Sequence, residues 1–156
     1  MNEKLSISEA QTKIEYYCSY QERCHQEVVE KLRQLGQTTA DIDSLLVHLI
    51  ENNFLNEERF ARSFVRGKHR IKGWGRHRIV NELKGRHITQ YILQAALQEL
   101  DPEEYETAFH RIAESHWEHL HDTNVLRKRK KFCDYMVRKG WESDWVYEKV
   151  KVLEQA

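Results

Sequence analysis

The sequence lacks the features that would place it in a membrane or in an oxidising compartment. It has three cysteines, an odd number at no framework spacing, so we expect reduced thiols rather than a disulfide scaffold. No stretch near the N-terminus is apolar enough for a signal peptide, and no later stretch is long and apolar enough to cross a bilayer. We therefore expect a soluble, cytoplasmic protein with no membrane partner.

Strand patterns and enzyme motifs are also lacking. No segment alternates with period two, so strands are not expected. The glycines of Gly73-Trp74-Gly75 follow a helical pattern and have no third glycine, which excludes the usual phosphate-binding loops. No Ser, His and Asp arrangement indicates a nucleophile, and the carboxylates lie in runs typical of solvated faces. We predict a protein that is not an enzyme and needs no cofactor.

The histidines do not have the spacing of a metal site. His110, His116, His119 and His121 are close in the sequence, and Cys133 follows them. A zinc site needs two ligand pairs that reach one ion, and only the pair His116 and His119 lies on one helical face. We therefore predict a solvated, histidine-rich helix and no bound metal.

Charge is segregated along a chain whose formal net charge is zero. Glu57–Gln90 holds ten Lys and Arg against three Asp and Glu, whereas Glu99–Asn124 holds eight acids against one base. Arg127–Lys139 is basic again, with seven bases against one acid. Alternating blocks of this kind predict separate basic and acidic patches, and the clustered arginine favours a polyanion or an acidic protein surface as partner.

Apolar residues recur at helical spacing throughout the chain, with recognisable helix ends. A capping box opens the first helix at Ser6 and Glu9, Gly36 suits a helix C-terminus, and Thr38 caps the next helix. Asp101-Pro102 begins a helix that runs on toward His121 and is predicted to be the longest. A last helical pattern covers residues 141–155.

The helical pattern repeats. A shift of 51 positions carries Val28, Val29 and Leu32 onto Ile79, Val80 and Leu83, and a further 53 gives Phe132, Cys133 and Met136. The same shifts carry Ile42 onto Leu93 and Val146, and only Lys149 departs badly from the apolar pattern. Two stripes held in one register predict an all-α, elongated tandem array of three three-helix repeats, at residues 1–53, 54–100 and 101–156.

The central stretch 54–88 presents an apolar side and a cationic side. Its first helix places on the apolar side the residues Phe60, Ala61, Phe64, Val65 and Ile71. Arginines recur on the opposite side, and we infer that few acids lie near enough to neutralise them. Trp74 and Trp141 stand beside glycines, where they can stack on bases, but we predict that both are core residues.

We assign the binding surface to this cationic side and to the matching helix of the third repeat. The candidate residues are Arg59, Arg62, Arg66, Lys68, Arg70, Lys72, Arg76, Arg78, Lys84, Arg86, Arg127, Lys130, Lys131 and Arg138.

Nearly the whole chain resembles the RecX family, the bacterial modulators of the RecA recombinase. The resemblance rests on residues 54–61 (FLNEERFA), on Phe64-Val65-Arg66, and on Gly75 with Arg78-Ile79 and Glu82-Leu83. It implies an all-helical array that binds the RecA–DNA filament and inhibits recombinase activity, with roles in recombination, DNA repair and the SOS response. It also implies a monomer that meets single-stranded DNA weakly or through the filament.

The chain departs from the family pattern at two places. Asn56, Glu57 and Glu58 replace an aspartate pair but preserve a helix cap and its acids. Arg86-His87-Ile88 replaces a Lys-Gly-Ile ending, so His87 must adopt the left-handed conformation that glycine adopts more easily.

Two other functions are compatible with the residues alone. One is a helical DNA-binding protein that works without the recombinase, and the other is a charged interaction scaffold that meets no nucleic acid. A protein that binds only DNA is expected to be basic overall, whereas alternating patches suit a target made of both protein and DNA.

Overall fold

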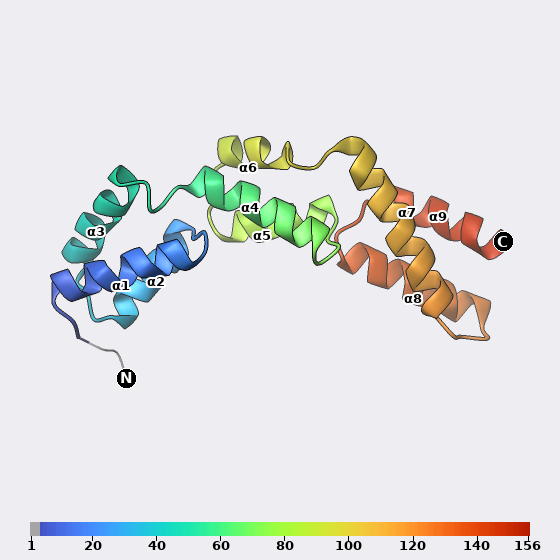
Figure 1. Ribbon diagram of the computed structural model, residues 1–156. Helices are drawn as coiled ribbons and strands as arrows, with labels where there is room; N and C mark the ends of the chain where they lie inside the picture. The colour runs from blue at the N-terminus through green and yellow to red at the C-terminus, as the bar shows by residue number, and fades with distance from the viewer. Residues whose placement is uncertain (1–3) are drawn as a thin grey trace. The chain divides into compact units, whose positions relative to one another are not determined.

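The computed structural model describes residues 4–156, and it folds them into nine helices without a strand (Figure 1). The helices are α1 (Ile7–Tyr20), α2 (His25–Gln34), α3 (Thr39–Glu51), α4 (Glu57–Arg70), α5 (Arg76–Gly85), α6 (Gln90–Leu97), α7 (Pro102–His119), α8 (Val125–Arg138) and α9 (Ser143–Gln155). The all-α prediction is confirmed.

Most of the predicted helix ends are also confirmed. The Ser6–Glu9 capping box has both of its hydrogen bonds, and the Thr38 side chain accepts a hydrogen bond from the backbone N–H of Asp41 at 3.2 Å. Asp101 caps α7 in the same way, with Pro102 at the first helical position. At 18 residues α7 is the longest helix of the described chain, and it ends at His119, two residues before the predicted limit.

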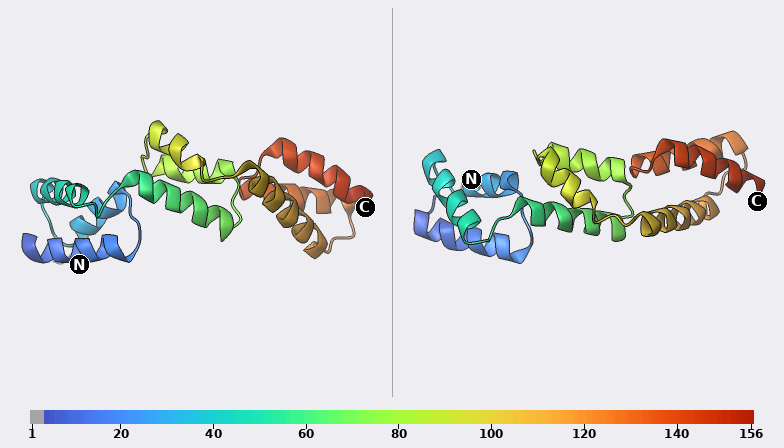
Figure 2. Two further views of the ribbon diagram at one scale, coloured as in Figure 1. Left: turned by 45° about the horizontal axis from the view of Figure 1, so that its top comes forward. Right: turned by 90° about the horizontal axis from the view of Figure 1, so that it is seen from above.

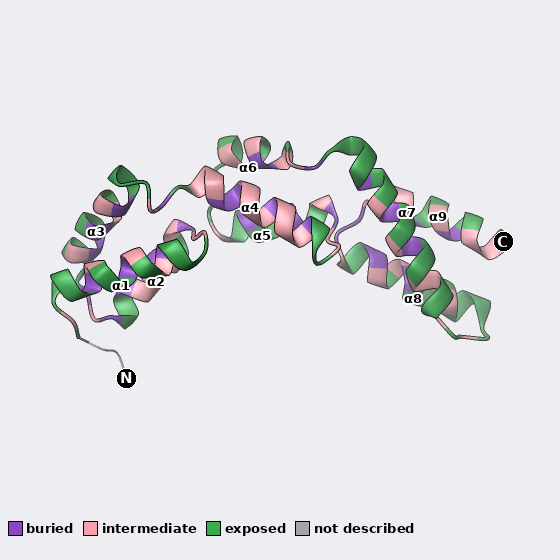
Figure 3. Ribbon diagram, in the orientation of Figure 1, coloured by how far each residue is buried: buried purple, intermediate pink, exposed green. Residues whose placement is uncertain are grey.

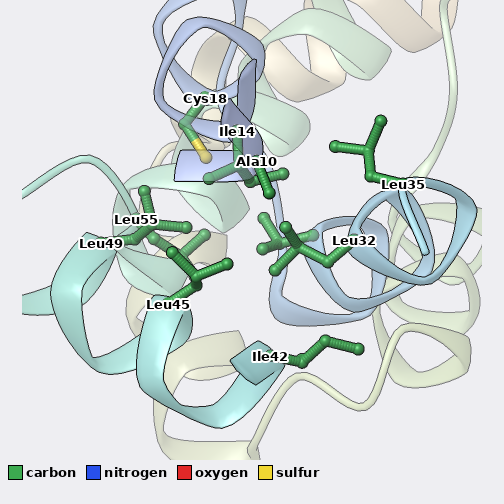
Figure 4. Packing of buried hydrophobic residues seen from close by; sticks show 10 residues of the cluster. Ala10, Ile14, Cys18, Leu32, Leu35, Ile42, Leu45, Leu49 and Leu55 are labelled. Carbon is green, nitrogen blue, oxygen red and sulfur yellow. The ribbon is translucent and has the colours of Figure 1, made fainter. Parts of the chain in front are cut away.

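The chain divides into two compact units, Met1–Ser63 with Arg86–Ala96 and Phe64–Gly85 with Leu97–Ala156. In the first unit α1, α2 and α3 enclose an apolar core (Figure 4). Ile14, Leu32 and Leu49 come from the three helices in turn and are wholly buried. Each helix has one buried stripe (Figure 3), as amphipathic periodicity requires.

The second unit has an aromatic core beneath α7, α8 and α9, which gather together in both views of Figure 2. The Trp141 ring lies 4.8 Å from that of Tyr105 and 5.5 Å from that of Phe109, measured between centroids. Phe132 and Met136 of α8 are fully buried. The prediction that Trp141 is a core residue is confirmed.

Positions related by the sequence shifts have the same burial. The related residues Val28, Ile79 and Phe132 are all buried, as are Leu32, Leu83 and Met136. The backbone agrees, because Gly36, His87 and Gly140 each have a positive φ, of 76°, 60° and 99°. His87 thus adopts the left-handed conformation that its position requires. These equivalences support the repeat pattern, while the boundaries of the three repeats remain a prediction.

Three of the predicted positions are wrong in detail. Ile71 is 81% exposed because α4 ends at Arg70 and the chain turns away before the apolar stripe continues. Trp74 is only half-buried, so it is not a core residue. The last helix begins at Ser143 rather than at Trp141. Among residues 4–156, no helix has both the length and the hydropathy needed to cross a membrane.

Candidate polyanion-binding surface

Most of the predicted binding arginines of α4 and α5 form ion pairs with carboxylates of the same chain. Arg66 Nη1 lies 2.7 Å from Glu99 Oε1, and Arg76 Nη1 lies 3.1 Å from Glu142 Oε1. Weaker pairs join Arg70 to Glu104 at 3.6 Å and Arg62 to Glu58 at 3.8 Å. The inference that few acids neutralise this side is therefore wrong, because the fold brings most of these acids from distant parts of the sequence.

Arg59 connects segments of the first unit. Its Nε donates to Glu22 Oε1 at 2.7 Å, and its two terminal nitrogens donate to Asn53 and to the backbone carbonyls of Asn53 and Phe54. A guanidinium with all its nitrogens bonded in this way ties the α1–α2 connection to the start of α4. Its geometry is that of a structural residue rather than of a docking contact. Asn56 caps the same helix, as predicted, by accepting from the backbone N–H of Arg59 at 3.0 Å.

Three of the four predicted cations of α8, all but Arg138, are also compensated. Arg127 binds both oxygens of Asp122, at 3.0 and 3.2 Å, and Lys131 contacts the same carboxylate at 3.0 Å. The bonds from Arg127, from the backbone N–H of Asn124 and from Lys131 hold the pKa of Asp122 well below its ordinary value. Lys130 pairs with Asp134 at 2.8 Å. This end of α8 therefore shows much less net charge than its sequence suggests.

Two cations beside Trp74, together with Lys72 and Lys139, differ from all of these. Lys68 Nζ lies 5.0 Å and Arg78 Cζ 4.0 Å from the centroid of the Trp74 ring, which is within cation–π range. Lys139 Nζ donates to the backbone carbonyl of Lys72 at 2.8 Å. Within residues 4–156, none of the four forms an ion pair with a carboxylate. We call Lys68, Lys72, Arg78 and Lys139 the cationic cluster.

Lys139 lies near two other positive charges, those of Arg78 and Lys72. Burial lowers the pKa of its ammonium group, and the positive charges of Arg78 and Lys72 lower it further. Arg78 and Lys72 are therefore near enough to Lys139 for their positive charges to disfavour its own. A phosphate or carboxylate placed among these cations would be attracted to all of them.

The backbone around the cluster is fixed by a close approach of two glycine turns. The N–H of Gly75 donates to the Lys139 carbonyl at 2.8 Å, and the N–H of His77 donates to the Gly140 carbonyl at 3.0 Å. A Cβ on Gly75 would lie 2.5 Å from backbone atoms of Gly140, so no larger residue fits without displacement. These contacts set Arg78 and Lys139 side by side.

The hydroxyl group of Tyr105 stabilises the start of α5, next to the cationic cluster. The hydroxyl of Tyr105 accepts from the backbone N–H of Arg76 at 2.9 Å and donates to Glu142 at 2.8 Å. The Arg76 guanidinium lies 4.8 Å from the centre of the Tyr105 ring, and His69 stacks on that ring with centroids 5.3 Å apart. Burial is the main cause of the raised pKa of Tyr105. The start of α5, where Arg78 lies, is thus held by both backbone and side chains.

The remaining predicted residues lie away from the cluster or contact their own unit. Lys84 and Arg138 are exposed near the ends of α5 and α8, and Arg86 Cζ lies 5.9 Å from the centre of the Phe60 ring. Sequence reasoning assigned Lys68, Lys72 and Arg78 to the surface but left out Lys139. The repeat pattern could have identified Lys139, because the shift of 53 positions aligns it with Arg86, which was predicted to bind.

The histidines of α7 make contacts within the protein. His116 stacks on Tyr135 with centroids 3.6 Å apart, and His119 Nδ1 lies 2.7 Å from the Ser115 carbonyl oxygen. Burial lowers the pKa of His116, and His119 and Lys139 lower it further. In the described part of the chain, no group of three or more His, Cys, Asp or Glu side chains is placed to hold a metal ion.

Residues 56–97 match the family model described as RecX, second three-helix domain. Three curated relatives are each called regulatory protein RecX. The Lactobacillus johnsonii protein is 34% identical over 99 residues, covering 64% of this chain and 36% of the relative. The Vibrio campbellii protein is 29% identical, covering 77% and 76%. The Prosthecochloris aestuarii protein is 26% identical and covers 88% of each. The alignment with the Lactobacillus johnsonii relative thus spans only about a third of that protein.

Two solved structures have the same fold. A crystal structure of regulatory protein RecX superposes with a TM-score of 0.81 at 23% identity, covering 93% of this chain and 72% of that one. The RecX structure from Lactobacillus salivarius gives a TM-score of 0.73 at 24% identity, covering 94% and 97%. The helical repeat architecture is therefore shared.

Proposed function

We propose that this chain, which belongs to the RecX family, binds the RecA–DNA filament and inhibits recombinase ATP hydrolysis and strand exchange. In this proposal it acts as a monomer in the cytoplasm, by binding alone and without catalytic residues or a cofactor. It binds single-stranded DNA weakly or only within the filament.

The cationic cluster carries this proposal. Ion pairs within the chain compensate most of the other predicted cations. Lys68, Lys72 and Arg78, with the unpredicted Lys139, form no ion pair with a carboxylate among residues 4–156. Such a site suits DNA phosphates or carboxylates of the recombinase. Trp74 adds an aromatic face between two of the cations.

A filament target fits the weak and distributed nature of these contacts. Each exposed cation contributes modestly and is screened by salt, so affinity depends on several contacts made at once. Protomers held in register on DNA present many such contacts, whereas a free protomer presents few. A chain with zero formal net charge also has little general attraction for bare DNA.

The test compares binding to assembled filaments, to DNA-free recombinase and to bare single-stranded DNA, at two salt concentrations. The protein is expected to prefer filaments, and the variant Lys72→Gln/Lys139→Gln to lose that preference. Arg33→Gln/Lys151→Gln is the matched control, because it removes the same charge from exposed positions outside the cluster. Tight binding to free recombinase with no effect on filaments would indicate sequestration and reject the proposal.

A further inference from the structure

A groove on the first unit combines exposed tyrosines with cations. None of the residues that line it was assigned to binding above. It has a volume of about 560 Å³ and is formed by α1, the α1–α2 connection and the last turn of α2. Its main lining residues are Lys13, Tyr16, Tyr17, Tyr20, Arg23 and Lys31. We call it the tyrosine groove.

Two of its rings face solvent. Tyr16 is 71% exposed and Tyr20 is 72% exposed, although both lie on the helix whose other face packs in the core. They stand one turn apart with ring centroids separated by 6.4 Å. Rings so exposed add little to the core, whereas paired aromatic faces on a rigid helix offer a ready surface for stacking.

Tyr17 forms the inner wall, and a cation is fixed on it. The guanidinium of Arg23 lies 3.6 Å from the centre of the Tyr17 ring, its Nε donates to the Tyr17 carbonyl at 3.0 Å, and Glu27 pairs with it at 3.7 Å. Lys31 Nζ lies 5.7 Å from the same ring. Arg23 is thus held in one orientation before any ligand arrives.

The charged side chains that line the groove are all cationic, although Glu27 pairs with Arg23 from outside the lining. Among the described side chains that line it, three are cationic and none is a carboxylate. Aromatic faces next to cations match the two parts of a nucleotide, because a base stacks on a ring and its phosphate is attracted to a lysine or arginine. A base inside a duplex has its faces covered by its neighbours, so this pairing selects unpaired bases.

We propose that the tyrosine groove binds single-stranded DNA, with bases stacked on Tyr16 and Tyr20 and phosphates next to Lys13 and Lys31. The inference deepens the proposed function by adding a DNA contact in the first unit. It does not need the recombinase, since the groove would bind an oligonucleotide by itself.

Fluorescence anisotropy with a short labelled oligo(dT) tests the proposal without recombinase. Stacking contributes enough per base that Tyr16→Ala/Tyr20→Ala should weaken oligo(dT) binding by about 30-fold or more. Tyr16→Phe/Tyr20→Phe keeps both rings and should bind within about threefold of the unsubstituted protein. The control Tyr91→Ala removes another ring, 82% exposed on α6, and should change nothing.

Unchanged oligo(dT) binding by the alanine pair would overturn the proposal. So would an equal loss in the phenylalanine pair, because the contact would then depend on hydroxyl groups. If the alanine pair lost only binding to DNA-free recombinase, the groove would be a protein contact and the proposal would also fail. Thermal unfolding should be the same for all variants, since the replaced rings are exposed. Oligo(dT) binding that depends on the tyrosines, without inhibition of recombinase, would uphold the groove and reject the proposed regulation instead.

Discussion

The cationic cluster should be visible as a change in the salt dependence of filament binding. Each phosphate neutralised on single-stranded DNA contributes about 0.7 to the slope of log affinity against log salt concentration. If all four cations contact phosphates, the cluster contributes a slope of about 2.8. Raising salt from about 50 to about 200 mM would then weaken binding by about 50-fold through the cluster alone.

Removing two of the four contacts halves that contribution. Lys72→Gln/Lys139→Gln should lower the slope by about 1.4, while Arg33→Gln/Lys151→Gln leaves it unchanged. Folding should be little affected, because the variant loses only an exposed hydrogen bond from Lys139 Nζ to the Lys72 carbonyl and also separates like charges. The measurement is filament binding over a salt series for the three proteins. Equal slopes in all three would refute the assignment of phosphate contacts to this cluster.

Three further predictions follow from contacts in the second unit. Gly140→Ala should destabilise the protein by more than about 1 kcal/mol, because φ is +99° and the new Cβ would lie 2.5 Å from the Arg78 backbone. Its control, Gly67→Ala, has open space around the new Cβ and should stabilise α4 by about 0.5–1 kcal/mol. Chemical denaturation measures the free energy of unfolding of both variants. Tyr105→Phe leaves the Arg76 N–H and Glu142 without their shared partner, so the free energy of unfolding should fall by about 1–3 kcal/mol. The pKa of Lys139 lies below the ordinary 10.5, so filament affinity should fall as rising pH removes the charge of its ammonium group. Lys139→Arg stays charged and should keep its affinity to higher pH. Identical pH profiles of the two proteins would exclude Lys139 from the contact.

The sequence predicted the helices and their ends well because those depend on nearby residues. The caps at Ser6, Thr38 and Asp101 require partners only three residues away, and the buried stripe of each helix is set by its own periodicity. The left-handed conformation that was predicted for His87 is also observed, with φ of 60°. The departure at Lys149 is tolerated because its side chain, 10% exposed, reaches Glu114 at 3.1 Å.

The candidate site was harder to predict because it depends on residues far apart in the sequence. The pairs Arg66–Glu99 and Arg76–Glu142 exist only once the second unit has folded, so a local count of charges overstates the basic surface. Lys139 joins the cluster only through the close approach of Gly75 and Gly140. No spacing rule encodes such tertiary contacts.

Inhibition of the filament is tested by measuring ATP hydrolysis by RecA filaments, assembled beforehand on single-stranded DNA, as this protein is added. We expect hydrolysis to fall as the unsubstituted protein is added. Lys72→Gln/Lys139→Gln should need a much higher concentration for the same effect, and Arg33→Gln/Lys151→Gln should act like the unsubstituted protein. Inhibition of equal potency by all three proteins would contradict the cationic cluster as the contact, and unchanged hydrolysis with the unsubstituted protein would contradict the proposed function itself.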